Sequence, residues 1–544
     1  MLLLSIACKK NAGEPALPPT PPRPFTYKQI SVDARSAAST NYNVNINPVI
    51  RISFPVDVDP ATITGSVTFR DKSGAVVNGI SSMENGDSTI VLRPASALNH
   101  ITQYTFNVST SLKSKNKGSL QSPISLNLIT SIDSTDKFPR ISDNELLDLV
   151  QKQTLKYFYD FGHPVSGLAR ERNTSGDVVT SGGSGFGIMA LVTGIHRQFI
   201  TRQQGFERIQ KIVDFLKNKA QTFHGAFPHW LNGSTGVVVP FSAKDDGADL
   251  VETSFLMQGL LTARQYFTGS DAAETALRQD ITELYNAVEW DWFRKGDENV
   301  LYWHWSPTFG FEMNHQIRGW NECLITYVLA ASSPTHSIPK IVYDNGYAQN
   351  GAIRNGNTYY GIKLPLGPPN GGPLFFSHYS FLGLNPKVLS DAYANYWDQN
   401  VAHSLINFNY SVANPQKFNG YSSAVWGLTA SDNNISGYSA HAPDNDLGII
   451  TPTAALSSMP YTPEQSMNAL RFFYYALGDK LWKEYGFIDA FNLTNVWFAN
   501  SFLAIDQGPI IIMIENHRSA LLWNLFMSTP EVKAGLLKLG FQIG

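Results

Sequence analysis

The period of the hydrophobic pattern changes once along the chain, and this change separates two domains of different class. Between residues 25 and 135, short runs such as VIRISFPVDV and TQYTFNVST alternate apolar and polar residues and are separated by turn signals. From about Ile141, apolar residues recur at steps of three and four, as in NELLDLVQKQTLKYFYDF. Period-two alternation is typical of half-buried strands, and the longer period is typical of amphipathic helices. The sequence therefore predicts a β-sandwich over residues 25–135 and a large all-α domain over residues 136–544.

The helical region contains two kinds of helix. The segment FGIMALVTGIHRQF is apolar on most sides, as an inner helix would be, whereas ITRQQGFERIQKIVDFLKNKA is polar on one face, as an outer helix would be. Helices are expected near residues 144–161, 187–199, 205–219, 248–267, 272–293, 320–331, 391–408, 463–477 and 508–527. Inner and outer helices in this number favour an (α/α)6 toroid, although another large α-fold would show the same periodicity.

Composition and charge limit the classes of binding partner that the chain can recognise. The formal net charge is −3, only 16% of the residues are charged, and there is no basic stripe. Because phosphate binding needs clustered Lys and Arg, we expect no nucleic-acid partner. Aromatic residues reach 12% of the chain, and rings exposed in loops can stack on the apolar faces of sugars, although most of these rings must belong to the core.

The chain begins with MLLLSIACKK, an apolar run followed by Ala7 and Cys8. This junction is typical of a bacterial lipoprotein signal, and the proline-rich residues up to residue 24 would form an extended tether. We therefore expect secretion through the inner membrane and lipidation of Cys8, which gives a periplasmic or outer-membrane-anchored lipoprotein. The alternative is a trimmed ordinary signal peptide with an incidental cysteine. If Cys8 is the anchor, Cys323 is a lone thiol.

Carboxylates occur at three places beside strongly apolar segments of the helical region. Asp245, Asp249 and Glu252 are spaced i, i+4 and i+7, so that on one helix they would share a face. Glu322 is expected one turn into an apolar helix, and Asp506 is expected between an apolar run and a helix that begins three residues further on. The simpler interpretation is that the first group caps a solvated helix end and that Asp506 is an N-cap. The functional interpretation is a set of acid–base groups at a cleft.

Loops between the expected helices carry further side chains suited to sugar binding. A sugar-binding groove needs exposed aromatic rings for stacking, together with charged and imidazole groups that hydrogen-bond the hydroxyls. The candidates are Glu171, Arg172, His229, Trp230, Trp303, Trp305, Arg318, Trp320, His378 and Tyr379. Each of these residues by itself is more simply structural, and only the whole set favours a groove.

The chain lacks the sequence motifs of several competing chemistries. It has no G-x-S-x-G elbow, no H-E-x-x-H pair and no P-loop, and its glycine-rich run GGSGFG has no lysine partner. We therefore predict no cofactor and no metal ion. A metal site built from His441 and Asp444 is a weaker alternative.

Several separated strings of the helical region resemble one known family. SGGSGFGIMAL, DDGADLVETSFLMQGLLTARQYF, GFEMNHQIRGWNECL and AIDQGPIIIMIENHRSALLW occur in chain order within residues 141–544 and resemble the bacterial glucoamylase-like domain of glycoside hydrolase family 144. The segment NPVIRISFPVDVDPATI is similar to bacterial immunoglobulin-like domains. The resemblance implies an (α/α)6 toroid that hydrolyses β-1,2-glucan or sophoro-oligosaccharides with inversion. Family members act as endo-glucanases or as exo-enzymes that release sophorose, and an added N-terminal sandwich favours the exo-acting ones.

The resemblance also assigns roles to residues. Asp245, Asp249, Glu252 and Glu322 match functional carboxylates of the family, and Glu322 would be the general acid. Asp506 would be the base, by analogy with a related β-1,2-glucanase family. These roles imply a proton path that runs through a substrate hydroxyl or a chain of water molecules.

Two other functions stay open. The first is hydrolysis of another glucan linkage, and the second is a non-catalytic surface lipoprotein that binds glycans and needs no acid–base pair. In each case we expect a monomer whose contact with the membrane is made only by the lipid anchor.

Overall fold

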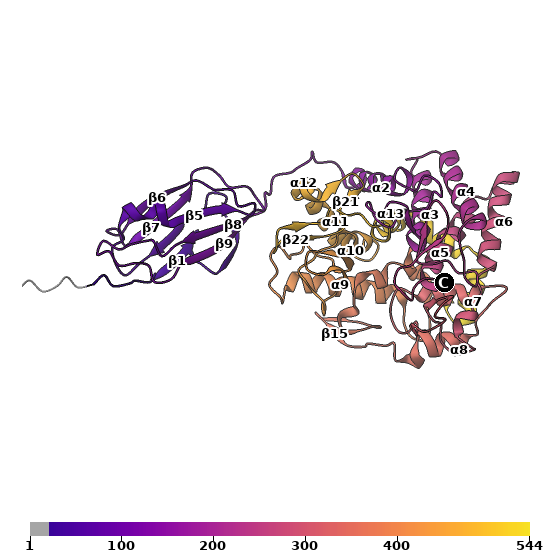
Figure 1. Cartoon of the computed structure of the whole chain (residues 1–544). Coiled ribbons are helices and arrows are strands. Elements are labelled where there is room, and N and C mark those ends of the chain that lie inside the picture. Colours follow the sequence, from indigo (N-terminus) through magenta and orange to yellow (C-terminus); the bar gives the residue numbers. More distant parts are fainter. Residues whose placement is uncertain (1–20) are drawn as a thin grey trace, which may run out of the picture. The chain divides into compact units, whose positions relative to one another are not determined.

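The computed structural model describes residues 21–544, which form two compact units, and the boundary between the units along the chain lies between Asp133 and Ser134 (Figure 1). Cys8 and most of the proline-rich segment lie outside the described residues. Within the described part of the chain, no helix is long and apolar enough to span a bilayer.

The first unit is a sandwich of two sheets. One sheet has the strand order β2-β1-β4-β7-β6, and the other has the order β3-β9-β8-β5 with a parallel pair between β3 and β9. Ile52 faces Ile90 in the first sheet and Phe69 faces Phe106 in the second, and all four side chains are buried between the sheets. The strands are β1 (Gln29–Val32), β2 (Arg35–Ser36), β3 (Thr40–Val44), β4 (Ile50–Ser53), β5 (Val67–Asp71), β6 (Gly79–Glu84), β7 (Thr89–Pro94), β8 (Gln103–Val108) and β9 (Ile124–Thr130), with the short helices η1 (Pro60–Thr62) and α1 (Ile63–Ser66) between β4 and β5.

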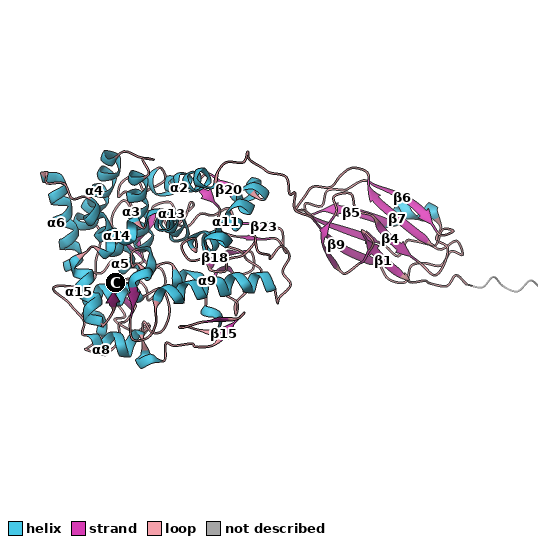
Figure 2. Cartoon of the chain, turned by 180° about the vertical axis from the view of Figure 1, so that it is seen from behind, coloured by secondary structure: helices cyan, strands magenta, loops and turns pink. Residues whose placement is uncertain are grey.

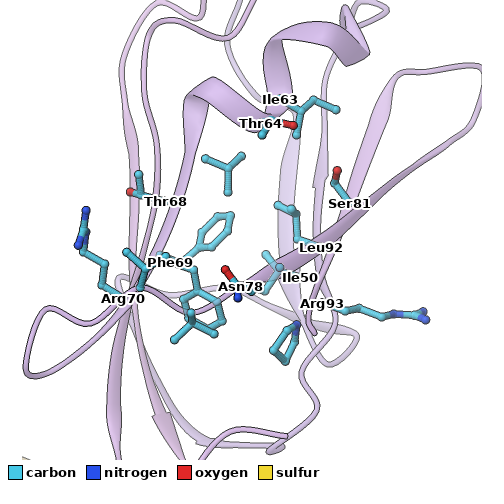
Figure 3. A pocket seen from close by; sticks show the side chains of 16 residues that line it. Ile50, Ile63, Thr64, Thr68, Phe69, Arg70, Asn78, Ser81, Leu92 and Arg93 are labelled. Atoms are coloured by element: carbon cyan, nitrogen blue, oxygen red, sulfur yellow. The ribbon is translucent and has the colours of Figure 1, made fainter. Parts of the chain in front are cut away.

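A cavity of about 290 Å³ lies between the two sheets, beside the edge strands β5 and β6. Ile50, Phe69 and Leu92 line its interior, whereas Arg70 and Arg93 point away from it (Figure 3). The lining contains no carboxylate or histidine. This cavity therefore offers no acid–base chemistry, and the candidate site lies in the second unit.

The second unit consists of helices joined by long loops that carry short strand pairs (Figure 2). Its α-helices are α2 (Asp143–Tyr159), α3 (Ser181–His196), α4 (Arg202–Asn218), α5 (Leu250–Tyr266), α6 (Ala272–Asn286), α7 (Leu324–Ser332), α8 (Lys340–Val342), α9 (Tyr396–Ala413), α10 (Pro452–Ser457), α11 (Pro463–Arg471), α12 (Gly478–Leu481), α13 (Ala504–Ser519), α14 (Leu521–Met527) and α15 (Pro530–Leu539). Its strands are β10 (Val178–Thr180), β11 (Trp230–Asn232), β12 (Val238–Val239), β13 (Ala248–Asp249), β14 (His304–Trp305), β15 (Thr358–Tyr359), β16 (Ile362–Lys363), β17 (Leu389–Ser390), β18 (Ala430–Asn433), β19 (Gly437–Ala440), β20 (Trp482–Lys483), β21 (Gly486–Phe487), β22 (Phe491–Asn492), β23 (Trp497–Phe498) and β24 (Gln542–Ile543).

Burial separates the helices into the two kinds that the sequence predicts. Helices α3, α5, α7, α10 and α13 are buried along nearly their whole length, whereas α2, α4, α6 and α11 bury only one face. The buried helix α3 packs against both α5 and α13, and α2 and α4 cover α3 (Figure 1). Two of the outer helices begin with strong caps, since Ser142 is the N-cap of α2 and Thr201 is the N-cap of α4, each with a complete capping box.

Glycines bring two inner helices unusually close together. A Cβ atom on Gly259 of α5 would lie 2.1 Å from the carbonyl oxygen of Gly185 in α3, and a Cβ on Gly185 would lie 2.1 Å from the carbonyl oxygen of Phe255. Only glycine avoids these overlaps with rigid backbone. A glycine-rich run is by itself a poor helix former. Here the run forms the beginning of α3, and not the loop before it, because its glycines permit the close contact with α5.

Other helix boundaries also differ from those expected. Helix α7 begins at Leu324, not at Trp320, because a turn with Gly319 at φ +75° precedes it. The helix expected over residues 508–527 is two helices, because Ala520 adopts a left-handed conformation with φ of 58°. Helix α10 was not expected at all, since its short and fully buried sequence shows no amphipathic period.

Candidate active site

A cavity of about 450 Å³ lies where the beginnings of α3, α5, α7 and α13 meet. It is lined by Glu171, Arg172, Thr180, His229, Trp230, Phe241, Glu252, Phe255, Trp303, Glu322, Phe375, Tyr379, Ala430, Tyr438, Ala440, Leu503 and Ile505. The lining thus combines carboxylates with aromatic rings, as the sequence predicts for a sugar-binding groove. The residues come from loops and helix ends that are far apart in the sequence.

Asp249 is the centre of a buried polar network beside this cavity. It is the N-cap of α5, and its Oδ1 accepts hydrogen bonds from two backbone N–H groups of the first turn at 3.0 and 2.9 Å. Its Oδ2 lies 3.0 Å from Nδ1 of His229 and 3.7 Å from Nε2 of His304, which pairs with Asp249 across β13 and β14. Asp245 lies behind the cavity wall with its Oδ2 3.6 Å from the same His304 nitrogen.

The expected arrangement of these carboxylates on one helix is wrong. Helix α5 begins at Leu250, so only Glu252 is helical, Asp249 is the cap and Asp245 belongs to the preceding loop. The strand pair β13–β14 and the cap bring them together instead. The capping interpretation holds for Asp249, but its side chain is fully buried and does not lie on a solvated face.

Burial and mutual charge set the protonation of this network. Burial opposes the charge of His229, but the negative charge of Glu252 and the hydrogen bond to Asp249 outweigh it and raise the pKa of His229 to about 9. Burial also opposes ionisation of Asp249, yet the hydrogen bond and positive charge of His229 lower its pKa. Burial and the charge of Asp249 raise the pKa of Asp245 to about 7, and burial lowers the pKa of His304 to about 4. At neutral pH the His229–Asp249 pair is therefore ionised and His304 is neutral.

Glu252 is held as a hydrogen-bond acceptor at the bottom of the cavity. Its Oε2 accepts hydrogen bonds from the backbone N–H of Gly182 at 2.8 Å and from the Thr180 hydroxyl at 3.2 Å. Burial raises its pKa, while these two hydrogen bonds act in the opposite direction. The fixed acceptor geometry suits Glu252 to positioning and makes it a poorer proton donor.

Glu322 is the carboxyl group of the cavity that is free of such bonds. It lies in the turn before α7, not one turn into that helix as expected, because Asn321 accepts the N–H of Cys323 and the helix starts only after this turn. Among the described residues, no other residue donates a hydrogen bond to its carboxyl group. Burial, together with the charges of Glu252 and Asp249, raises the pKa of Glu322 to about 7. Glu322 therefore keeps a transferable proton up to near-neutral pH.

An ion-paired group forms another part of the wall. Arg172 donates from Nε to both carboxylate oxygens of Glu171 at 3.1 and 2.9 Å, and from Nη1 to both carboxylate oxygens of Asp432 in β18 at 3.3 and 3.2 Å. Ser501 also donates its hydroxyl to Asp432. The guanidinium is thus paired with two carboxylates through Nε and Nη1.

Asp506 lies just behind this wall. Helix α13 begins at Ala504, before the expected start at Pro509, so Asp506 lies inside the first turn and caps nothing. Its side chain is 1% exposed, and its neighbours Leu503 and Ile505 line the cavity in its place. Burial, with the charge of nearby Asp489, raises the pKa of Asp506 well above its usual range.

Four of the loop residues predicted to bind sugar do not reach the cavity, and Asp245 and Asp249, also predicted to bind substrate, are not part of its lining. Trp305 packs in an aromatic cluster outside it. Arg318 is exposed and donates to Gln316 and to a backbone carbonyl. Trp320 is 4% exposed within the core, and His378 is 1% exposed with its Nε2 3.0 Å from a buried serine hydroxyl. Exposure of a loop residue is decided by the surrounding chain, so the residue type alone did not locate these side chains.

The sequence pattern did not identify some side chains of the site. Phe241 stacks on His229 with ring centroids 4.3 Å apart, and Tyr438 projects from β19. Phe241 is 50% exposed and Tyr438 is 47% exposed. Neither lies in a distinctive sequence pattern. Asp489, which is buried next to Asp506, shares the sequence signal that singled out Asp506, an isolated acid between apolar residues.

Donor atoms of His229, Asp245 and Asp249 lie within 4.8 Å of one another, a spacing that could hold a cation. However, His229 and Asp249 hydrogen-bond each other, and the raised pKa of His229 favours the imidazolium form, which cannot ligate a metal. His441 is buried while Asp444 is exposed, and they belong to no such cluster among the described residues.

Family models match both units of the chain. A family described as "Putative glucoamylase" matches residues 314–530, and the bacterial Ig-like domain matches residues 28–130. The structure is similar to an endo-β-1,2-glucanase from Chitinophaga pinensis, solved with sophorotriose and glucose, with 54% identity and a TM-score of 0.72 over 74% of this chain and 99% of the other. It is also similar to a β-1,2-glucanase from Parabacteroides distasonis, with 37% identity and a TM-score of 0.72 over 96% of this chain and 74% of the other.

A curated relative from Parabacteroides distasonis is an exo-β-1,2-glucooligosaccharide sophorohydrolase that acts at the non-reducing end. It is 47% identical over an alignment of 422 positions that covers 73% of this chain. The matched region spans 58% of the relative's length.

Proposed function

The chain belongs to glycoside hydrolase family 144 and carries an N-terminal Ig-like domain, and from this premise we propose that it hydrolyses β-1,2-glucan or sophoro-oligosaccharides. The observation that carries the proposal is the state of Glu322. Its carboxyl group faces a cavity with aromatic walls, receives no hydrogen bond from another described residue and has a pKa raised to about 7. A glycosidase needs such a carboxylic acid to protonate the leaving oxygen.

The other groups of the cavity supply binding and the base. The ionised His229–Asp249 pair and the acceptor Glu252 offer charged hydrogen-bond partners to sugar hydroxyls, and Trp230, Trp303 and Phe241 offer ring faces. In an inverting mechanism, a second carboxylate removes a proton from the attacking water. We assign this role to Asp506. Because Asp506 is buried behind the lining, the proton must travel through a substrate hydroxyl or a water chain.

We also propose that the helices of the second unit form an (α/α)6 toroid. In support, α3 contacts α5, α5 contacts α7, α10 contacts α13 and α13 contacts α3, as expected of neighbours in an inner ring. Along the sequence, the 3₁₀ helices η6 (Leu374–Ser377) and η7 (Ser380–Leu382) lie between α7 and α10. Most of their residues are buried, and together they would supply the remaining inner member of the ring. Helices α2, α4, α6, α9 and α11 would be outer members. A crystal structure of the second unit tests this closure.

Product analysis tests the activity. The purified protein is incubated with β-1,2-glucan, with a β-1,3-glucan and with an α-1,4-glucan, and the products are separated by chromatography. We expect products only from β-1,2-glucan, with sophorose alone if action is exo and a ladder of oligosaccharides if it is endo. NMR of the first product formed gives the anomeric configuration, which is inverted. Binding of β-1,2-glucan without any product would support the non-catalytic alternative and contradict the proposal.

Replacement of Asp506 tests the base. Asp506→Asn keeps the volume of the side chain but cannot accept the proton of the attacking water. We expect kcat to fall by about 10²–10⁴, the range that general acid–base catalysis usually provides. An unchanged kcat in a folded variant would move the role of base to another carboxylate.

We propose further that Cys8 carries a lipid anchor, on the basis of the Ala7–Cys8 junction and the proline-rich segment after it. Expression of the chain behind a full native signal, with Cys8 or with Cys8→Ser, tests this. We expect the unchanged chain in the membrane fraction and the Cys8→Ser variant in the soluble fraction with the same kcat. Membrane retention of Cys8→Ser would count against the anchor.

A further inference from the structure

A second group of aromatic side chains lies outside the cavity, and one of its rings is strongly exposed. Trp292 of the 3₁₀ helix η2 (Trp292–Arg294) is 42% exposed. The imidazole of His224 covers one face of its indole, with ring centroids 3.8 Å apart and planes inclined by 13°. Trp305 of β14 packs edge-on, with its centroid 4.8 Å from that of His224 and 6.4 Å from that of Trp292. The solvent-exposed area of Trp292 therefore belongs to the opposite face of the indole and to its edges. We call the rings of His224, Trp292 and Trp305 the outer platform.

Hydrogen bonds of the protein itself hold the outer platform in place. Oε2 of Glu289 lies 2.8 Å from Nδ1 of His224, and the backbone N–H of Glu289 donates to the carbonyl oxygen of His224 at 3.0 Å. The backbone N–H of Trp292 donates to the carbonyl oxygen of Glu289 at 3.0 Å. His224 itself has φ of +51°, a conformation that is uncommon outside glycine and that surrounding contacts must hold. Because the rings are fixed before a ligand arrives, binding to them would cost little conformational entropy.

Polar atoms border the rings and leave hydrogen-bonding capacity unused. A carboxylate only accepts, so Nδ1 of His224 carries the hydrogen shared with Glu289, and Nε2 has no partner among the described residues. The indole N–H of Trp305 likewise donates to no described residue and reaches solvent. The carboxylate of Glu289 is partly exposed and can accept further hydrogen bonds. A free ring face with donors and acceptors at its edge suits a sugar, which stacks its apolar face and hydrogen-bonds through its hydroxyls.

The outer platform lies next to the cavity along the chain. Trp303 lines the cavity, His304 lies 3.7 Å from Asp249, and Trp305 belongs to the platform. Consecutive Cα atoms are about 3.8 Å apart, so the Cα atoms of Trp303 and Trp305 are less than about 8 Å apart. A long glucan in the cavity can therefore reach the platform with its outer units, whereas an oligosaccharide that fills only the cavity does not.

We propose that the outer platform is a second glucan-binding site, which holds units of a long β-1,2-glucan outside the cavity on the free face of Trp292. The β-1,2 linkage of this ligand rests on the proposed function. The platform takes no part in bond cleavage. A sugar suits it better than a protein partner, because one free ring face matches one sugar ring, whereas a stable protein interface needs roughly 800 Å² on each side.

Affinity electrophoresis of the full chain tests the site by binding alone. All proteins in this experiment carry Glu322→Gln, so that the glucan in the gel is not cut. We expect β-1,2-glucan to retard the parent protein and Trp292→Ala to weaken its apparent affinity about three- to tenfold, the contribution of one aromatic stack. Trp292→Tyr keeps a flat ring over His224 and should restore most of the retardation. Tyr27→Ala is the matched control, because it removes a ring of similar exposure from the sandwich and should change nothing.

Chain length separates the outer platform from the cavity in kinetics. With Glu322 intact, Trp292→Ala should raise KM for long β-1,2-glucan by a similar factor and leave kcat, and KM for sophorotriose, unchanged. Melting temperatures show whether the variants are folded, and Trp292→Leu, which is apolar but not flat, replaces Trp292→Ala if the latter melts early. Equal retardation of the folded variant and its parent, or an equal rise of KM on both substrates, overturns the proposal. Altered oligomeric state with unchanged retardation would assign the rings to a protein interface and overturn it as well.

The outcomes also distinguish this site from the proposed function. If β-1,2-glucan is not hydrolysed by the unchanged chain but retards it in a Trp292-dependent way, the proposed function fails and the second site stands. If it is hydrolysed and the retardation does not depend on Trp292, the second site is refuted and the proposed function stands. Trp292-dependent retardation by β-1,3-glucan instead of β-1,2-glucan would overturn the ligand assigned here.

Discussion

Glu322 and Glu252 lie beside the same cavity, but their surroundings favour different roles. Glu252 accepts two hydrogen bonds that stabilise its ionised form, whereas the carboxyl group of Glu322 receives none from another described residue. The burial of both groups raises both pKa values. The hydrogen bonds therefore separate a positioning carboxylate from a proton donor.

The substitution Glu322→Gln tests the donor directly. It keeps the side-chain volume but removes the transferable proton, so we expect kcat on β-1,2-glucan to fall by about 10²–10⁴. The pKa of Glu322 is raised in the folded protein, so the folded state binds the proton more tightly and stability falls as pH rises from about 4.5 through about 7. The variant lacks this loss, and its melting temperature should exceed that of wild type at pH 8 but not at pH 4.

Glu464→Gln is the matched control, because Glu464 is an exposed carboxylate in the first turn of α11. It should change neither kcat nor the pH dependence of melting. Near-wild-type turnover in Glu322→Gln would make Glu252 the next candidate for the acid.

The pH–rate profile of the wild-type enzyme reflects the same group. Because the acid must be protonated, kcat should fall as pH rises through about 7, the pKa of Glu322. Asp245 titrates in the same range, so variants must show which of the two groups causes the alkaline limb of the profile. We expect the residual rate of Glu322→Gln to lose this alkaline limb and that of Asp245→Asn to keep it. An alkaline limb that persists in Glu322→Gln would refute the assignment.

At the scale of elements, the site depends on how closely α3 and α5 approach each other. Gly185 and Gly259 let the two backbones meet, and this contact sets the position of Thr180 and Gly182 against Glu252. The low helix propensity of the glycine-rich run is outweighed by burial of the whole helix. In this run local propensity disfavours a helix and tertiary packing favours one, and the contribution of packing is the larger.

A methyl group at this contact should be strongly destabilising. In Gly259→Ala the new Cβ would lie 2.1 Å from a backbone oxygen of α3, so the helices must separate. We expect a loss of at least about 1–3 kcal/mol in the free energy of unfolding of the second unit, measured by denaturant titration. Gly65→Ala is the control, because a Cβ at Gly65 in α1 meets nothing within 4 Å. Equal stability of Gly259→Ala and wild type would show that α3 and α5 can separate freely.

At the scale of the whole molecule, the candidate site belongs to one of the two units. All residues of the cavity and its supporting network lie between Glu171 and Asp506, in the second unit. The cavity of the sandwich has no carboxylate or histidine in its lining.

We therefore expect the fragment 134–544 to keep the kcat and KM of the full chain on β-1,2-glucan. Kinetics and thermal melting of the fragment and of the full chain are compared side by side, with the fragment 1–133 as a control that should release no product. A fragment 134–544 that melts like the full chain but is inactive would show that the sandwich completes the site.

The sequence by itself determined the succession of a strand-rich and a helical domain, because the two periods of apolar residues follow from the geometry of strands and helices alone. It also singled out Glu252, Glu322 and Asp506, since an acid within an apolar segment is costly without a partner or a function.

Only the tertiary structure decided which side chains meet. Asp245 and Asp249 come together through a strand pair and a cap and not through one helix, and Trp320 and His378 are placed in the core although their residue types suit a sugar site. The hydrogen bond from the backbone N–H of Asp432 to the carboxyl group of Asp489 likewise joins segments far apart in the sequence. Contacts of this kind depend on burial and direction, which arise only when the helices and loops pack, and no spacing along the chain records them.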